Sequence, residues 1–243
     1  MLLLAFIFGL IYGSFINVII FRLPENLSII SPRSFCPKCK SKIPFYNNIP
    51  LLSFIIQKGK CFSCKHLISI QYPIVEFLLG LICLLSYKFL ILPDSIFFSL
   101  ISGLLICIVV IDYRYFIIPL ELIISILIIC LPYILYFSDW RYHIYGMLMG
   151  IGYLSLVFIF TWIITKKQPL GFGDLQLILI LGLWLGPLKI LSTIFLGSIL
   201  GIIYWIYLGI KNGYVKNIKL PFGSFLSIAA IIMYLIPLNW RFI

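Results

Sequence analysis

Long apolar runs separated by short polar segments make up most of this chain of 243 residues. A helix needs about 20 apolar residues to cross the hydrocarbon core of a bilayer, and runs of this kind recur along the sequence. The pattern predicts an all-α polytopic membrane protein with about eight transmembrane helices. We expect spans at 2–21, 73–92, 95–112, 116–137, 144–165, 174–188, 190–210 and 222–239.

Residues 22–72 are the one long segment that lacks such a run. A module of this size is too short to be stabilised by an apolar core alone, and a metal ion or disulfides usually supply the missing stability. The pattern therefore divides the chain into a first transmembrane helix (1–21), a small module (22–72) and a membrane domain (73–243).

Composition and charge exclude a soluble protein and orient the helices. Hydrophobic residues make up 63% of the chain and charged residues 10%, which is typical of a protein whose solvent is the bilayer. The net charge is +11, and fourteen of the 18 lysines and arginines fall in four alternate segments between spans. Such clustering marks the cytoplasmic side, so we expect no nucleic-acid partner, and we expect the C-terminal end with Trp240 to lie outside. The basic segments are Arg22–Lys65, Arg114, Lys166–Lys167 and Lys211–Lys219.

Four cysteines inside the module form two CxxC pairs, Cys36 with Cys39 and Cys61 with Cys64. Two thiolates at this spacing can bind one ion from a tight turn, and two such turns complete a closed tetrahedral zinc site. The alternative is a pair of disulfides or redox-active dithiols, which a cytosolic location disfavours because that compartment keeps thiols reduced. We therefore predict a structural zinc ion bound by the four cysteines.

Four acidic residues lie within or at the ends of apolar runs, where a charge is costly and usually functional. Asp112 ends the third predicted span and Asp174 begins the sixth, so the predicted topology puts both at one depth on the cytoplasmic side. Asp174 follows Gly171 and Gly173, and glycine permits close approach of a main chain and backbone conformations closed to other residues. This context suits a site where an extended peptide lies against the enzyme. The other two acids are Glu76 and Glu121.

Two carboxyl groups held close together are suited to cleaving a peptide bond. Both cannot ionise easily, so one holds a proton while the other acts as a base. The base takes a proton from the attacking water, and the acid supports the carbonyl oxygen and protonates the departing amine. Either Asp112 or Asp174 can be the base on this reasoning, because such a pair titrates as a unit.

The order of several motifs resembles the type IV prepilin peptidases, a family of the GxGD aspartyl proteases. A lone GxGD box is a weak signal, whereas this ordered series runs almost the length of the chain and is highly specific. The matching residues are Gly9, Gly13–Phe15, Asn17–Val18, Arg22–Pro24, Pro32–Ser34, Ile43–Pro44, Asn48–Pro50, Ser53, Gly59–Cys61, Tyr72–Glu76, Ile111–Asp112, Ile118–Pro119, Gly171–Asp174 and Pro221–Gly223.

This resemblance implies an aspartic endopeptidase in residues 73–243 with Asp112 and Asp174 as its catalytic pair. The expected substrates are type IV prepilin and pseudopilin precursors, which lose a short basic leader after a glycine at the cytoplasmic face of the bacterial inner membrane. Family members with the cysteine-bearing loop typically also methylate the new N-terminal amine with S-adenosylmethionine, so we expect this second activity here. The methyltransferase candidates are Glu76, Arg22 and Asn48.

Two other functions would account for part of the pattern. A transporter would use Glu76, Asp112 and Asp174 as an ion or proton path, but it predicts acids near mid-membrane and broken helices in matching halves of the chain. A zinc-containing membrane assembly factor without catalysis would explain the cysteines and leave the GxGD box unexplained. We therefore favour the peptidase.

Overall fold

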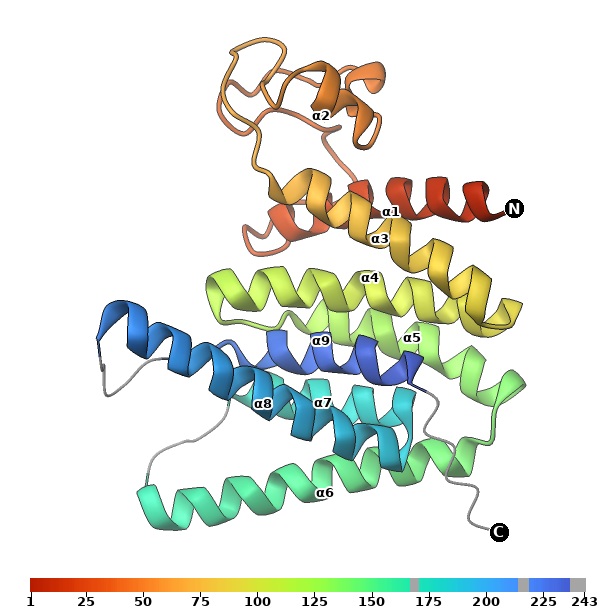
Figure 1. The fold of residues 1–243 in the computed structure, drawn as a ribbon, viewed down its shortest axis with the longest axis vertical. Coiled ribbons are helices and arrows are strands. Elements are labelled where there is room, and N and C mark those ends of the chain that lie inside the picture. The colour runs from red at the N-terminus through yellow and green to blue at the C-terminus, as the bar shows by residue number, and fades with distance from the viewer. Residues whose placement is uncertain (167–170, 214–218, 237–243) are drawn as a thin grey trace. The chain divides into compact units, whose positions relative to one another are not determined.

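The computed structural model describes residues 1–166, 171–213 and 219–236, and its regular structure is helical (Figure 1). The sequence-based expectations for Lys167, Lys216 and Trp240 fall outside the described residues. The long helices are α1 (Leu2–Arg22), α3 (Gln71–Phe89), α4 (Leu92–Tyr115), α5 (Leu120–Phe137), α6 (Trp140–Thr165), α7 (Phe172–Leu185), α8 (Pro187–Asn212) and α9 (Phe222–Leu235).

The segment between α1 and α3 folds as a small module with little regular structure. It contains one 3-10 turn, η1 (Phe45–Asn48), and one short helix, α2 (Leu52–Ile56). Among the described residues, extended pairing is limited to two isolated bridges in this module, Phe35 with Lys42 and Lys60 with Leu67. Each bridge closes the turn that carries one CxxC pair.

Six helices of the described chain, α1, α3, α4, α5, α6 and α8, are long and apolar enough to cross a membrane. Helices α7 and α9 are apolar but have 14 residues each, so at 1.5 Å per residue each covers about 21 Å of a hydrocarbon core about 30 Å thick. Helix α7 ends early because Gly186 has a φ of 79° and Pro187 begins the next helix. The chain is an all-α polytopic membrane protein, as predicted, with the sixth and eighth expected spans formed by short helices.

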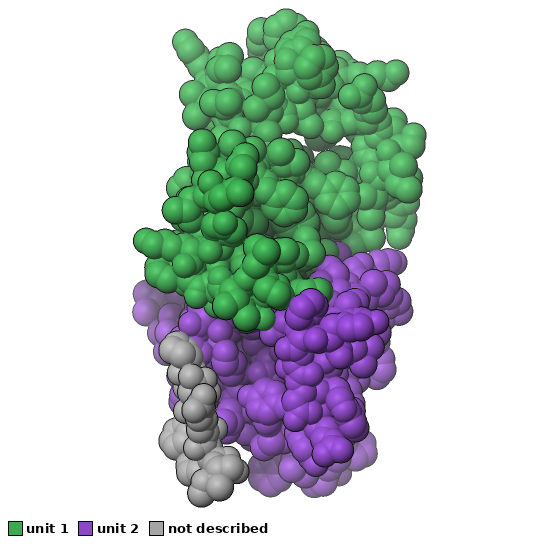
Figure 2. Space-filling model, turned by 90° about the vertical axis from the view of Figure 1, so that its right-hand side faces the viewer, with its two compact units in different colours: residues 1–107 green, residues 108–243 purple. Residues whose placement is uncertain are grey.

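The chain divides into two compact units, residues 1–107 and 108–243 (Figure 2). In the first unit, α1 packs along α3. Gly9 and Gly13 allow this close approach, since a Cβ atom on Gly13 would lie 2.6 Å from the Cα atom of Glu76. Small residues four positions apart let two membrane helices pack backbone against backbone.

In the second unit, α7 is the central helix, and it packs against α5, α6, α8 and α9. Every residue from Leu177 to Leu185 except Leu179 is buried. A helix that is apolar on all sides can be enclosed by other helices or face lipid, and the burial of these residues shows that α7 is enclosed. This packing fixes the position of the α7 N-terminus, where Asp174 lies.

Candidate active site and metal cluster

Asp112 lies near the end of α4, and its carboxylate caps the N-terminus of α9. Its Oδ2 atom accepts hydrogen bonds from the backbone N–H of Ser224 at 2.7 Å and from the Ser224 hydroxyl at 2.9 Å. The α9 N-cap is Pro221, which has no side-chain acceptor, so the first N–H groups of the helix need an acceptor from elsewhere. A carboxylate at this end is also favoured by the helix dipole. Asp112 is 5% exposed, and these bonds hold one of its oxygens in place.

Asp174 also accepts a hydrogen bond at a helix N-terminus, that of α7. It is the third residue of that helix, and its Oδ2 atom accepts from the backbone N–H of the N-cap residue Gly171 at 3.2 Å. Gly171 has a φ of −71° and a ψ of 148°, which is extended backbone open to any residue. The expectation of an unusual backbone conformation is therefore wrong at Gly171. Its missing side chain matters instead, since a Cβ atom there would lie 3.2 Å from Asp174 Oδ2.

The N-termini of α7 and α9 share a local pattern and pack on one side chain. Each helix begins with Phe and Gly, and the third position is Asp174 in α7 and Ser224 in α9. A Cβ atom on Gly173 would lie 3.1 Å from Ile118 Cβ, and one on Gly223 would lie 2.6 Å from Ile118 Cδ1. Because both glycines contact Ile118, the two helix ends are held next to each other.

The two aspartates consequently belong to one site. Their carboxyl groups are near enough for their charges to interact, and Asp174 is half-buried while Asp112 is buried. Two such groups that share one proton form a combined acid and base, which is what activation of a water molecule requires. The structure therefore brings together the pair that the sequence singled out, and their catalytic roles stay a prediction.

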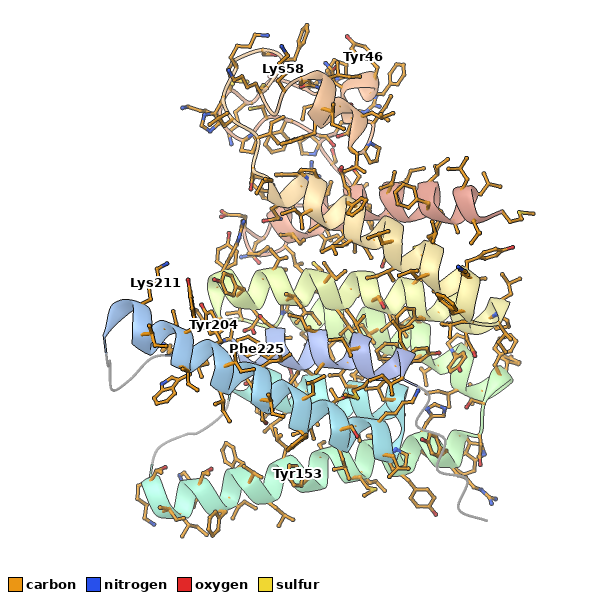
Figure 3. All side chains as sticks on the ribbon, viewed as in Figure 1. Tyr46, Lys58, Tyr153, Tyr204, Lys211 and Phe225 are labelled. Carbon is orange, nitrogen blue, oxygen red and sulfur yellow. The ribbon has the colours of Figure 1, made fainter. Side chains whose placement is uncertain are left out.

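Three aromatic side chains from the elements that carry the site contact one another. Tyr113 follows Asp112 directly, and its hydroxyl accepts a hydrogen bond from that of Tyr204 on α8 at 3.4 Å. The ring of Tyr204 lies 5.5 Å from that of Phe225, the residue after Ser224 (Figure 3). We refer to Tyr113, Tyr204 and Phe225 as the aromatic wall. Its rings are exposed or half-buried, so the wall can receive an apolar side chain.

Sequence reasoning missed Ser224 and the aromatic wall. The motif assigned to Pro221–Gly223 stopped one residue short of Ser224. The repeated Phe-Gly pair at the start of two helices is the signal that could have found it. The aromatic wall combines side chains from three helices, which no pattern within one element reveals. Glu121, the fourth acid singled out, is exposed in the first turn of α5.

The four cysteine side chains of the module converge, as predicted. The sulfur atoms of Cys36, Cys39, Cys61 and Cys64 all lie within 4.8 Å of one another, and those of Cys36 and Cys64 are 3.9 Å apart. Four sulfurs bound to one zinc ion at about 2.3 Å would be about 3.8 Å apart in a tetrahedron. The cluster therefore fits a tetrahedral metal site with little rearrangement.

The two CxxC turns have the same backbone geometry. In the first turn, the Lys40 N–H donates to the Cys36 carbonyl at 2.9 Å, and in the second the Lys65 N–H donates to the Cys61 carbonyl at 3.0 Å. Lys40 and Lys65 both have a φ of 58°. This repeated turn presents both thiols of each pair toward the same point.

The pKa values of the thiols in the cluster shift in opposite directions, because hydrogen bonds favour some thiolates and each thiolate disfavours its neighbours. A hydrogen bond with the Ser41 hydroxyl lowers the pKa of Cys39 to about 6, and the backbone N–H of Cys64 lowers the pKa of Cys61. The backbone N–H of His66 also favours the Cys64 thiolate, but desolvation and the neighbouring thiols raise the pKa of Cys64 to about 11. A divalent cation would offset the charge of four thiolates, so the donor set fits a metal ion.

Arg22 is buried and organises the start of the module. Its guanidinium group donates to several carbonyl oxygens of the loop, and its charge lies 5.6 Å above the ring of Phe35. The accepting carbonyls belong to Ser28, Ile29, Pro32 and Arg33. Through these contacts, Arg22 holds the loop that follows α1 in place.

Glu76 is also buried, in the second turn of α3. Its Oε2 atom accepts from the Leu51 N–H of the module at 2.8 Å, and Ser14 of α1 hydrogen-bonds to the same carboxylate. Asn48 is exposed on η1. Glu76 therefore joins the module to α1 and α3, while the methyltransferase roles of Glu76, Arg22 and Asn48 stay predictions.

Two protein families match the chain in succession. Residues 7–89 match the bacterial peptidase A24 N-terminal domain, and residues 96–206 match the type IV leader peptidase family. The first match contains the cysteine cluster, and the second contains Asp112 and Asp174.

Similar proteins extend over nearly the whole chain. The prepilin leader peptidase/N-methyltransferase of Bacillus subtilis is 33% identical, with 97% of this chain and 94% of the relative aligned. The type 4 prepilin-like proteins leader peptide-processing enzyme of Escherichia coli is 34% identical over 94% of this chain and 91% of its own length. The prepilin leader peptidase/N-methyltransferase of Neisseria gonorrhoeae is 28% identical over 95% and 89%. No solved structure shows a significant match. The chain belongs to the prepilin leader peptidase/N-methyltransferase family.

Proposed function

We propose that the protein is an integral-membrane aspartic endopeptidase that removes the leader peptide of type IV prepilin and pseudopilin precursors. The observation that carries this proposal is the convergence of Asp112 and Asp174 at two adjacent helix N-termini. Family membership supports the substrate class. A transporter is less well supported, because both aspartates lie at the ends of their helices rather than midway along them.

The pair would cleave the peptide bond by activating water. One carboxylate takes a proton from the water as the water oxygen bonds to the carbonyl carbon, and the protonated partner supports the carbonyl oxygen. When the C–N bond breaks, a proton passes to the departing amine. The leader then ends in a carboxylate and the mature chain begins with a free amine. Hydrogen bonds from Ser224 and Gly171 orient the two carboxyl groups before substrate binds.

We infer that the site and the module face the cytoplasm of a bacterium whose inner membrane holds the helices. The support for this orientation is the clustering of basic residues in alternate segments between the apolar runs. The module carries seven exposed lysines and arginines, and Arg114 is exposed two residues after Asp112. Positive charge of this kind is retained on the cytoplasmic side during insertion.

We infer that the cysteine cluster binds a structural zinc ion through Cys36, Cys39, Cys61 and Cys64. The separations of the sulfur atoms and the chemistry of four thiols support zinc. With four protein ligands the site has no open position, so zinc would stabilise the module and would not act on the substrate. A module of about 50 residues with little regular structure gains stability from such a contribution.

We propose N-methylation of the newly formed amine as a second activity. Its support is the family to which the chain belongs and the complete cysteine cluster. S-adenosylmethionine would supply the methyl group. The guanidinium group of Arg22 and the carboxylate of Glu76 already hydrogen-bond to the backbone of the module. These bonds give the two side chains a structural role and assign them no contact with S-adenosylmethionine.

The aspartate pair is tested by incubating a prepilin precursor with the purified protein and following leader removal by mass spectrometry. Asp112→Asn and Asp174→Asn keep the size of the side chain and remove its ability to ionise, so each should abolish cleavage. Glu121→Gln changes an exposed acid outside the site and should cleave as the wild type does. Cleavage at the wild-type rate by either Asn variant would show that the pair is not the catalytic machinery.

The methyl transfer is tested on the same product, by the mass of its new N-terminus. A variant with the four cysteines replaced by serine should lose both bound zinc and methylation. Cleavage should persist, because the aspartates and the cysteines belong to different compact units. Methylation that survives loss of the metal would separate the cluster from this activity.

A further inference from the structure

The module turns an apolar face outward. The one buried side chain of α2 is Ser53, whose hydroxyl accepts from the Ile49 N–H at 2.9 Å and donates to the Tyr46 carbonyl at 3.2 Å. Ile55 and Ile56 of the same helix are 69% and 77% exposed. This is the reverse of a helix in a water-soluble module, which buries its apolar face. The other exposed apolar side chains of residues 45–56 are Phe45, Tyr46, Ile49 and Leu52.

The backbone of residues 45–56 is attached below the ends of two membrane helices. The Leu51 N–H donates to Glu76 at 2.8 Å, and Ser14 hydrogen-bonds to the same carboxylate. Glu76 lies five residues into α3, and Ser14 lies eight residues before the end of α1. At 1.5 Å per residue the attachment is about 7 to 12 Å along these helices. Both helices are long and apolar enough to span, so the attachment lies on the bilayer side of the helix ends, about as deep as the apolar face of an interfacial segment reaches.

Basic side chains border the apolar face. Seven lysines and arginines of the module are exposed, and Glu25 is its one acidic residue. Lys58 lies two residues after the end of α2, and Figure 3 shows Lys58 and Tyr46 on the module. Anionic headgroups attract a lysine or arginine near the membrane surface by about 1 kcal/mol each. An apolar face with a cationic border is the composition of a segment that lies in the membrane interface.

We propose that residues 45–56 form an interfacial segment, which inserts its apolar side chains among the lipids next to α1 and α3 and sets the bordering lysines on anionic headgroups. The occupant of this face is lipid because both ends of the module continue into membrane helices, which hold the segment at the bilayer surface. Insertion removes six exposed apolar side chains from water, and this burial is favourable in proportion to the apolar area. The proposal rests on the spanning helices and does not depend on the peptidase activity.

Tryptophan fluorescence tests this contact in the full chain, reconstituted alone in nanodiscs at one copy per disc. The module has no tryptophan, and the five native ones lie elsewhere, so the emission added by Ile56→Trp is obtained by difference from the parent protein. Phospholipid brominated on its acyl chains quenches tryptophan that it contacts. We expect the added emission of Ile56→Trp to be quenched at least about twofold more strongly than that of a hydrated control.

His66→Trp is the matched control, because His66 is an exposed aromatic side chain with the Lys38 ammonium 3.4 Å from its ring nitrogen. Zinc content equal to that of the parent shows that the module is folded in both variants. Replacing anionic by neutral lipid should weaken the quenching of Ile56→Trp. Equal quenching of the two variants would overturn the proposal, and so would quenching of Ile56→Trp that appears only when a second copy shares the disc.

Discussion

Ser224→Ala removes one of the two hydrogen bonds that orient the Asp112 carboxyl group. The Ser224 hydroxyl lies 2.9 Å from Asp112 Oδ2 and 3.0 Å from the Val109 carbonyl oxygen. It can therefore donate to an ionised Asp112, or accept from a protonated one while donating to Val109. This hydroxyl serves the carboxyl group in both protonation states, which an acid and base pair passes through in each catalytic cycle.

The expected loss follows from the strength of that bond. A hydrogen bond to a charged group contributes about 1.5 to 3 kcal/mol, and each 1.36 kcal/mol is tenfold in rate, so kcat should fall about 10- to 150-fold. The backbone N–H of residue 224 still holds Oδ2 in the variant, so activity should not vanish. Ser224 is 2% exposed and offers little surface to substrate, so KM should change little.

Cleavage kinetics on a prepilin precursor, with leader and mature chain separated by mass, measure both constants. Ser224→Thr keeps the hydroxyl and should recover most of the activity. Ser227→Ala is the matched control, because Ser227 is buried on the same helix and its hydroxyl has no hydrogen-bond partner among the described residues. If Ser224→Ala cleaves within about twofold of wild type, well below the loss expected for such a bond, then orientation of Asp112 by this hydroxyl is refuted.

Three further changes follow from the same geometry. Gly223→Ala would put a Cβ atom 2.6 Å from Ile118 Cδ1 and 3.2 Å from Asp112 Oδ2. Overpacking of this kind costs about 1 to 3 kcal/mol, so cleavage should fall at least about fivefold. Gly209→Ala, with open space around it, should leave cleavage unchanged. Tyr204→Ala removes the middle ring of the aromatic wall and should raise KM about fivefold with kcat nearly unchanged. Tyr153→Ala, on α6, is the control, and an equal rise in KM in this variant would contradict the prediction. Chelation of the bound metal should abolish methylation and make the module more susceptible to limited proteolysis, while leader removal continues. Loss of both activities together would show that the two units depend on each other.

The helical architecture could be predicted from the sequence because a bilayer imposes a length and a polarity on every spanning segment. The expected span 2–21 and the observed α1 (Leu2–Arg22) differ by one residue at the module end. The ends of α7 differ more, since the expected span 174–188 runs through Gly186 and Pro187, where the chain turns. Hydropathy alone does not register that turn, because the residues on both sides are apolar.

The acidic residues and cysteines of the candidate sites could be predicted from the sequence, but the residues that orient them could not. The rarity of acids in an apolar chain singled out Asp112 and Asp174, and the CxxC spacing singled out the four cysteines, because these signals are local. Ser224 escaped because its hydrogen bond to Asp112 joins two helices far apart in sequence. The unusual backbone conformation expected at Gly171 was wrong for a local reason: the residue is the N-cap of α7 with an extended backbone, and its missing side chain leaves room for Asp174.

By itself, the sequence determined that the chain spans a membrane, that its module carries a four-cysteine cluster, and that two acids stand at the ends of apolar helices. Each of these follows from composition or from spacings of a few residues, which local chemistry dictates. Only the tertiary structure decided that Asp112 caps α9, that Ile118 holds Gly173 and Gly223 together, and that the module exposes Ile55 and Ile56 beside α1 and α3. These features arise from packing between segments far apart in the chain, where the energy of a contact depends on geometry that no single segment contains.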